Sequence, residues 1–324
     1  MAIDFNDGIN LSTCDGLNLH VLIPQVRGGP MLWDIIHRID FKHDDTLAAL
    51  LAALGAKHKL LPHGYPEYAS AVIIELWNTK KGPQIKMKYH RNSNEVGFED
   101  ATSAIQGCSL EQGYCSYADF KKRSEPYNPK NITKLCDDVP GNYEKKKRDY
   151  VMNRNQEIHW MVENDADKMD PNEKPFNDFS PKFAVPSSNA ENELIFLHMI
   201  WRHGDRTPKW LCKNDPNNAS TWVEGLGQLT PTGMEQQQRL GSLIFNEYAV
   251  KQKLISQRYE SNQIYFRSTD VNRTLLSAVS NLVGMYFNRP EQIANLDYPS
   301  MKGWPNGYVP VAVHTLQTKY DHVG

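Results

Sequence analysis

The chain has 324 residues, of which 40% are hydrophobic and 23% charged, and its formal net charge is −2. This composition excludes a disordered chain, and the balanced charge excludes a whole-molecule field that would attract nucleic acid or an anionic membrane. No stretch approaches the run of about 20 apolar residues that a membrane span needs.

The pattern of residue types divides the chain into three regions. Residues 1–130 alternate helix and strand signals, residues 131–190 are polar and rich in Pro, and residues 191–324 return to a globular pattern. The middle region predicts a linker with one polar helix over 143–163. We interpret its basic run, 144–148, as a solvated helix face rather than a nucleic-acid patch.

The first region predicts two helices and then a hairpin. Gly29-Pro30 opens one helix, and the apolar stretch 47–54, capped by Asp44 or Asp45 and ended by Gly55, forms the next. The Val- and Ile-rich run 71–77, a turn at 80–83 and the alternating positions 85–89 predict a strand, a turn and a second strand.

The third region alternates strands with helices. Its predicted strands are 194–201, 264–266 and 309–314, and its predicted helices run from Thr230 to about Ala249 and from a cap at Thr269 or Asp270 through Leu282. Such alternation predicts an α/β fold with a mostly parallel sheet covered on both faces, which is a three-layer αβα core.

The run that follows strand 194–201 carries the most informative chemistry; it reads Arg202-His203-Gly204-Asp205-Arg206-Thr207-Pro208. Ligands of open α/β sheets bind beyond the carboxyl ends of the strands, where Arg202 and His203 are expected. Arginine forks match phosphate oxygens, so Arg202 and Arg206 predict a phosphate site around an imidazole. An imidazole held against phosphorus is placed for in-line attack and a covalent intermediate. The non-functional alternative is a basic loop with a surface histidine. A run as long as 202–208 rarely occurs by chance, which argues against that alternative.

Two further segments complete the candidate site. Arg267 follows the predicted strand 264–266 and would clamp the phosphoryl group, although an isolated arginine there would be interpreted as a surface residue. His43 and Asp44 precede helix 47–54, whose N-terminus favours anions. There His43 would donate to a phosphate oxygen and Asp44 would protonate the leaving alcohol, or Asp44 is only a helix cap. A protonated Asp44 is favoured by a nearby phosphate dianion and an acidic working pH.

The cysteines and the N-terminus give mixed signals about the compartment. The five cysteines leave at least one thiol unpaired within a monomer, and Cys108 and Cys115 are close enough to bridge. No second cysteine or histidine pair has zinc-like spacing, so no metal site is expected. No other cofactor is expected either. No signal peptide is expected, yet four glycosylation sequons occur, at Asn10, Asn131, Asn218 and Asn272. The sequence therefore predicts no localisation.

Taken together, the motifs resemble the histidine acid phosphatases, the branch that contains prostatic and lysosomal acid phosphatase. The resemblance rests on segments 202–208, 266–274 and 43–47, with supporting matches at 225–230, 68–76 and 107–115. It implies that His203 is the nucleophile that becomes phosphorylated, that Asp44 is the proton donor and that no metal is needed. It also implies that phosphate is bound by Arg202, Arg206, Arg267 and His43.

The order of the motifs differs from the order in the family. The family's Arg-His-Gly segment precedes its His-Asp segment, whereas here His43-Asp44 lies far upstream of Arg202-His203. We therefore interpret 1–130 as similar to the C-terminal half of such a phosphatase and 191–324 as similar to the N-terminal half. Residues 131–190 join them, and the family's helical cap domain is expected to be largely absent.

The sequence thus predicts an acid phosphatase that hydrolyses small phosphomonoesters through a phosphohistidine and has no nucleic-acid partner. A homodimer in which Asp44 of one chain serves His203 of another is compatible with the sequence. One alternative is a catalytically inactive phosphatase-like protein or the product of two joined paralogous gene halves. Another is a mutase or phytase-like relative, against which the segments around Arg267 and His43 argue.

Overall fold

The computed structural model describes residues 13–14, 17–18, 44–128, 192–213 and 215–316. The helix opened by Gly29-Pro30, the linker 131–190 and its polar helix lie outside these ranges, so their predictions stay untested.

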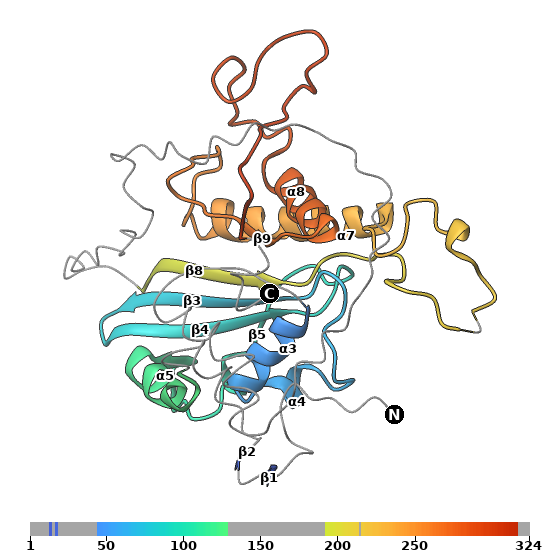
Figure 1. Ribbon diagram of the computed structural model, residues 1–324. Coiled ribbons are helices and arrows are strands. Elements are labelled where there is room, and N and C mark those ends of the chain that lie inside the picture. The colour runs from blue at the N-terminus through green and yellow to red at the C-terminus, as the bar shows by residue number, and fades with distance from the viewer. Residues whose placement is uncertain (1–12, 15–16, 19–43, 129–191, 214, 317–324) are drawn as a thin grey trace, which may run out of the picture. The chain divides into compact units, whose positions relative to one another are not determined.

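After the linker the described elements alternate between strands and helices, as the sequence predicts, whereas before it two helices are followed by a run of strands (Figure 1). Before the linker they are β1 Thr13–Cys14, β2 Leu17–Asn18, α3 Asp44–Ala53, α4 Lys57–Leu60, β3 Ala71–Thr79, β4 Gly82–His90, β5 Glu99–Asp100, η1 Thr102–Ala104, β6 Leu110–Glu111, β7 Tyr114–Ser116, α5 Tyr117–Ser124 and η2 Glu125–Tyr127. After it they are β8 Glu193–Trp201, η4 Ala219–Thr221, α7 Pro231–Ile244, the π-helix η5 Phe245–Lys251, β9 Arg267–Thr269, α8 Asn272–Tyr286 and β10 His314–Leu316.

One sheet joins the two sides of the linker. Its strands follow the order β6-β7-β4-β3-β8, with β5 paired to β4. Ala71 at the start of β3 lies opposite His90 of β4 on one side and opposite Trp201 of β8 on the other. Figure 1 shows β4, β3 and β8 side by side. The strand that leads to Arg202 is therefore built onto a hairpin that lies far upstream in the chain.

The prediction of a mostly parallel sheet is wrong for the described residues. Every ladder of this sheet is antiparallel, and the parallel pair is β9 with β10, which form a separate two-stranded sheet. The reason lies in the connections. Only Lys80-Lys81 separates β3 from β4, whereas a parallel crossover needs about a dozen residues.

Apolar side chains of β3 alternate between two buried clusters, as expected for a strand covered on both faces. Val72 and Ile74 pack with Leu47 of α3 and with other apolar residues of α3 and α4 in one cluster. Ala71 and Ile73 belong to the other cluster, which is formed with α7, η5 and α8. β8 contributes to both clusters, so the helices before and after the linker cover the sheet that they share.

Several local predictions are confirmed. Apart from Ala52, the apolar stretch 47–54 is buried; it runs along α3 to one residue past the end of that helix, and Gly55 follows with φ 69°. Cys108 forms a disulfide with Cys115. Thr230 caps α7 by accepting a hydrogen bond from the Gly233 N–H.

Other boundaries are wrong. The strand predicted at 264–266 is β9, three residues later, and the strand predicted at 309–314 is β10, which begins at His314. Neither Thr269 nor Asp270 caps α8, because the cap position is Val271, which has no side-chain oxygen to offer. By contrast, the helix predicted to run to about Ala249 has that extent: it changes from α-helical to π-helical at Phe245 and continues to Lys251.

Candidate active site

The loop that follows β8 carries the predicted arginine and histidine, and both are buried. Arg202 is 8% exposed and His203 is 3% exposed. The Arg202 N–H donates to the carbonyl of Ser70 at 2.9 Å, and the Ala69 N–H donates to the carbonyl of His203 at 3.2 Å. These two bonds extend the pairing of β8 with β3, so residues upstream of the linker border the candidate nucleophile.

A hydrogen bond within the loop fixes the tautomer of His203. Its Nδ1 lies 2.7 Å from the carbonyl oxygen of Gly204. A carbonyl oxygen only accepts, so Nδ1 carries the proton and donates it. In the neutral ring the lone pair then resides on Nε2, which is the nitrogen available for attack on phosphorus.

Glycine at position 204 is required by close packing against α7. A Cβ on Gly204 would lie 2.2 Å from the carbonyl oxygen of Gly233, and a Cβ on Gly233 would lie 2.2 Å from that of Asp205. The Gly204 N–H donates to the Ser277 hydroxyl of α8 at 3.2 Å, and the Gln237 amide of α7 donates to the Arg202 carbonyl at 2.9 Å. Two helices thus hold the backbone on both sides of His203.

The remainder of the loop is fixed by side chains at the start of α7. The Asp205 N–H donates to the Gln236 amide oxygen at 2.7 Å, and its carboxylate accepts from the Thr230 hydroxyl at 2.7 Å. Thr207 is 1% exposed, and its hydroxyl donates to the Gly225 carbonyl at 2.6 Å. A loop held at so many points costs little reorganisation when a ligand binds.

The predicted arginines lie in two elements: Arg202 and Arg206 in the loop after β8, and Arg267 in β9. Arg206 lies in the same loop, and one of its guanidinium nitrogens donates to the Thr207 carbonyl at 3.0 Å. Arg267, 5% exposed, is the first residue of β9 and not the residue after a strand. The residues that precede Arg202 and Arg267, Trp201 and Phe266, stack edge to face with centroids 5.6 Å apart.

His43 lies outside the described residues, and Asp44 is described only as the first residue of α3. The contact of either side chain with His203 therefore stays a prediction. α3 and Ile200 of β8 share one buried cluster, which ties the helix that Asp44 begins to the strand that leads to Arg202.

His198 of β8 lies close to the site in the chain, but it is not a candidate acid or base. Burial lowers the pKa of its imidazole to about 3, so the ring is neutral at mildly acidic pH.

The residues that hold the loop in place could not be recognised from the sequence motifs. Gln237 and Ser277 lie on helices that the sequence predicts without assigning either residue a role in the site, and Tyr68 lies within the supporting match 68–76. The tilted ring of Tyr68 lies 5.8 Å from that of His203. A polar residue on an otherwise buried helix face, such as Gln237 at 0% exposed, is the signal that would have drawn attention to them.

Within the described ranges, no group of three His, Cys, Asp or Glu side chains is arranged to hold a metal ion. No helix among these residues has the length and apolar character needed to cross a bilayer.

Residues 193–323 match the model of the histidine phosphatase superfamily, branch 2. The chain is 36% identical to human prostatic acid phosphatase over 141 residues, which is 44% of this chain and 34% of the human protein. It is 38% identical to mouse prostatic acid phosphatase over 131 residues, 40% of this chain and 32% of that protein. It is 37% identical to Xenopus laevis lysosomal acid phosphatase over 141 residues, 43% of this chain and 30% of that protein. The chain thus spans about a third of the length of the curated relatives it matches.

Proposed function

We propose that the chain is a phosphomonoesterase of the histidine acid phosphatase type. The observation that carries the proposal is the hydrogen bond from His203 Nδ1 to the Gly204 carbonyl, which leaves Nε2 as the nucleophilic nitrogen beside Arg202. The match of residues 193–323 to a histidine phosphatase model supports it, as do relatives named acid phosphatases. These names do not favour the alternative of a chain that binds phosphate esters without hydrolysing them.

The proposed reaction has two steps. Nε2 of His203 attacks phosphorus, the phosphorus–oxygen bond of the ester breaks, and Asp44 gives its proton to the leaving alcohol. Water then attacks the phosphorus of the phosphohistidine while the ionised Asp44 takes a proton from the water. The bond between phosphorus and Nε2 breaks, its electron pair returns to His203, and inorganic phosphate leaves. Arg202, Arg206, Arg267 and His43 would bind the phosphate oxygens, where negative charge is concentrated during transfer.

The substrate class and the assembly follow from the same proposal. We infer small phosphomonoesters as substrates and no nucleic-acid partner. The α/β core would be the histidine phosphatase type with its helical cap domain largely absent, residues 1–130 corresponding to the family's C-terminal half and 191–324 to its N-terminal half. A homodimer stays a prediction, which sedimentation of the purified chain tests.

The direct test is hydrolysis of 4-nitrophenyl phosphate at mildly acidic pH. We expect turnover that His203→Ala abolishes and that His58→Ala, at an exposed histidine of α4, leaves unchanged. Asp44→Asn should slow an alkyl phosphate by about 100-fold or more. It should slow 4-nitrophenyl phosphate much less, because nitrophenolate leaves without a proton. Absence of turnover in the parent chain, or equal turnover in His203→Ala, would refute the proposal.

A further inference from the structure

The loop that links α4 to β3 touches both Arg202 and His203. It turns sharply at Ala69, whose φ of 56° is a conformation that residues with a Cβ rarely adopt. Beyond this turn Ser70 accepts the Arg202 N–H, while the Ala69 N–H reaches the His203 carbonyl. Backbone strain of this kind is found preferentially at functional sites.

The turn brings aromatic rings against the guanidinium of Arg202. The central carbon of the guanidinium lies 4.3 Å from the centre of the Tyr68 ring and 5.4 Å from that of Tyr65. Both distances lie within the range of about 6 Å over which a cation is attracted to an aromatic face. A guanidinium nitrogen of Arg202 also donates to the carbonyl of Pro66 at 2.6 Å.

The carbonyl of Pro66 and the rings of Tyr65 and Tyr68 can orient Arg202, and none of the three carries a charge that would neutralise it. A carbonyl oxygen and an aromatic face carry no formal charge, whereas a carboxylate in the same place would cancel the charge of the guanidinium. Since an arginine side chain stays protonated in proteins, Arg202 brings a positive charge that attracts an anion. Its low exposure strengthens both the contact with the ring and the attraction to a ligand.

Of the two rings, that of Tyr68 is placed to act on the reaction centre. It is closer to the guanidinium than Tyr65 and also lies against the imidazole of His203. Tyr65 is 43% exposed, so solvent weakens its contact with Arg202. One ring thus touches the candidate phosphate ligand and the candidate nucleophile, and it comes from the part of the chain that precedes the linker.

We propose that Tyr68 is a positioning residue that holds the Arg202 guanidinium in the orientation that binds phosphate. The inference rests on the proposed function, because it assigns phosphate binding to Arg202. The face of the ring carries the effect, so phenylalanine can replace tyrosine and an aliphatic side chain cannot.

The test measures binding of inorganic phosphate by calorimetry to the full chain carrying His203→Ala, so that no covalent step intervenes. Adding Tyr68→Leu should raise the Kd by about tenfold, the order of effect that a largely desolvated cation–π contact supplies. Adding Tyr68→Phe should leave the Kd within about twofold, because the face of the ring remains. In the active parent, Tyr68→Leu should raise the inhibition constant of phosphate by the same factor.

The matched control is Tyr127→Leu. This substitution removes a ring that lies 5.4 Å from the guanidinium of Arg123. It should leave phosphate affinity unchanged both in the chain carrying His203→Ala and in the active parent. Melting temperatures separate positioning from folding. If Tyr68→Leu does not fold, Tyr68→Met, with a flexible side chain of similar size, makes the same comparison.

The two proposals fail in different ways. If the parent carrying His203→Ala binds phosphate and folded Tyr68→Leu binds it equally well, the role of Tyr68 is refuted and the proposed function stands. If Tyr68→Phe weakens binding as much as Tyr68→Leu, the face of the ring is not the cause and the proposal is also refuted. If the parent binds no phosphate and turns over no ester, the proposed function fails and takes this inference with it.

Discussion

The carboxylate of Glu75 in β3 accepts a hydrogen bond from the hydroxyl of Tyr248 in η5 at 2.8 Å, although the two residues lie 173 positions apart in the chain. Neither side chain is exposed to solvent. Burial and the neighbouring Glu75 carboxylate raise the pKa of Tyr248, so its hydroxyl keeps the proton that it donates. Residues before and after the linker are therefore joined by a buried polar contact as well as by the shared sheet.

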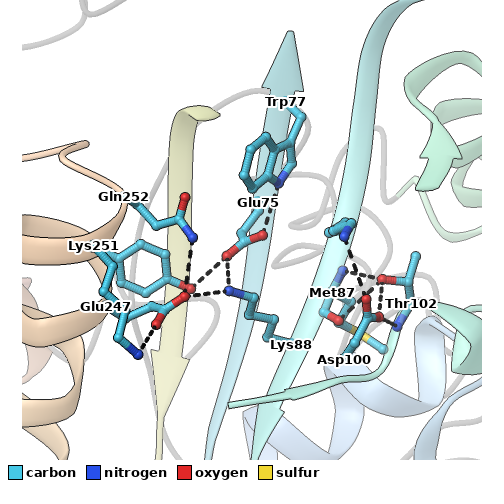
Figure 2. Close-up of polar contacts among 11 residues, drawn as sticks. Glu75, Trp77, Met87, Lys88, Asp100, Thr102, Glu247, Lys251 and Gln252 are labelled. Carbon is cyan, nitrogen blue, oxygen red and sulfur yellow. Dashed lines mark hydrogen bonds and ion pairs between the residues drawn. The ribbon is translucent and has the colours of Figure 1, made fainter. Parts of the chain in front are cut away.

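Glu75 is the centre of a larger polar cluster, which Figure 2 shows. Lys88 of β4 lies 2.9 Å from Glu75 and 3.0 Å from Glu247 of η5, and the Trp77 indole donates to Glu75 at 2.9 Å. We call Glu75, Lys88, Glu247 and Tyr248 the Glu75 cluster.

Breaking the Glu75 cluster should destabilise the fold strongly. Glu75→Ala leaves the Tyr248 hydroxyl without its acceptor and leaves Lys88 with Glu247 as its remaining carboxylate in the cluster, which should lower the free energy of unfolding by about 3 kcal/mol. Tyr248→Phe removes one hydrogen bond and should lower it by about 1–2 kcal/mol. The exposed pair Lys81–Glu111 is the control, since Glu111→Ala should change the free energy of unfolding by less than about 1 kcal/mol. Urea unfolding measures all three, and equal losses for Glu75→Ala and Glu111→Ala would contradict the account.

The same cluster predicts how stability changes with pH. Burial alone would raise the pKa of Glu247, but its contacts with Lys88, Lys251 and Gln252 outweigh that effect and lower it below its usual 4.5. Its contribution is therefore present above pH 4.5 and lost as the pH falls through the lower, folded value. For Lys88, burial would lower the pKa, yet Glu75 and Glu247 raise it above 10.5, so its contribution is complete below that pH and is lost above it.

The acid limb of the stability profile tests this prediction. Thermal unfolding of the parent should show a steeper loss below pH 4.5 than Glu247→Gln, which has no carboxylate to protonate at that position. If the two profiles run parallel through that range, the pKa of Glu247 is not depressed by the fold.

Close packing at Gly204 predicts a large effect on turnover. A Cβ there meets backbone atoms of Gly233, which cannot move aside as a flexible side chain does, so Gly204→Ala should shift the loop that carries His203. A displacement of about 1 Å is enough to reduce turnover by about 100-fold. Gly97→Ala is the matched control, because nothing lies within 4 Å of its Cβ and it should keep parental turnover. Parental kinetics in Gly204→Ala would contradict the geometry of the loop.

The disulfide between Cys108 and Cys115 is predicted to add modestly to stability. The two cysteines are 7 positions apart, and closing so short a loop contributes about 2 kcal/mol in the chain-entropy model. Cys115→Ser should lower the midpoint of urea unfolding accordingly. Cys212→Ser, which replaces an exposed free cysteine, should leave the midpoint unchanged. The idea fails if adding a reductant to the parent does not reproduce the loss seen in Cys115→Ser.

Local features of the fold could be predicted from the sequence because local chemistry decides them. Thr230 caps α7 as its place before Pro231 indicates, and the turn between β3 and β4 follows from Lys80-Lys81-Gly82. Whether neighbouring strands of the sheet run parallel or antiparallel could not be predicted from the sequence. The apolar run of β8 is typical of a strand covered on both faces, but such a run does not say whether its neighbour runs parallel or antiparallel.

For the candidate site, the sequence likewise predicts the local motif but not the contacts that hold it in place. Arg202, His203 and Arg206 can be picked out from residue type and spacing, and the structure shows in addition that the first two are buried. The contacts that hold them come from Tyr68, Gln237 and Ser277, which lie in other elements. Such contacts depend on how strands and helices pack together, and no local pattern encodes that packing.

The most direct test of the central claim is to trap the covalent intermediate. The purified chain is mixed with a ³²P-labelled phosphomonoester, quenched in alkali, in which phosphohistidine survives, and digested for mass spectrometry. The account predicts phosphate on Nε2 of His203 and no label in His203→Ala. Rapid turnover with no labelled peptide, or label that persists in His203→Ala, would contradict it.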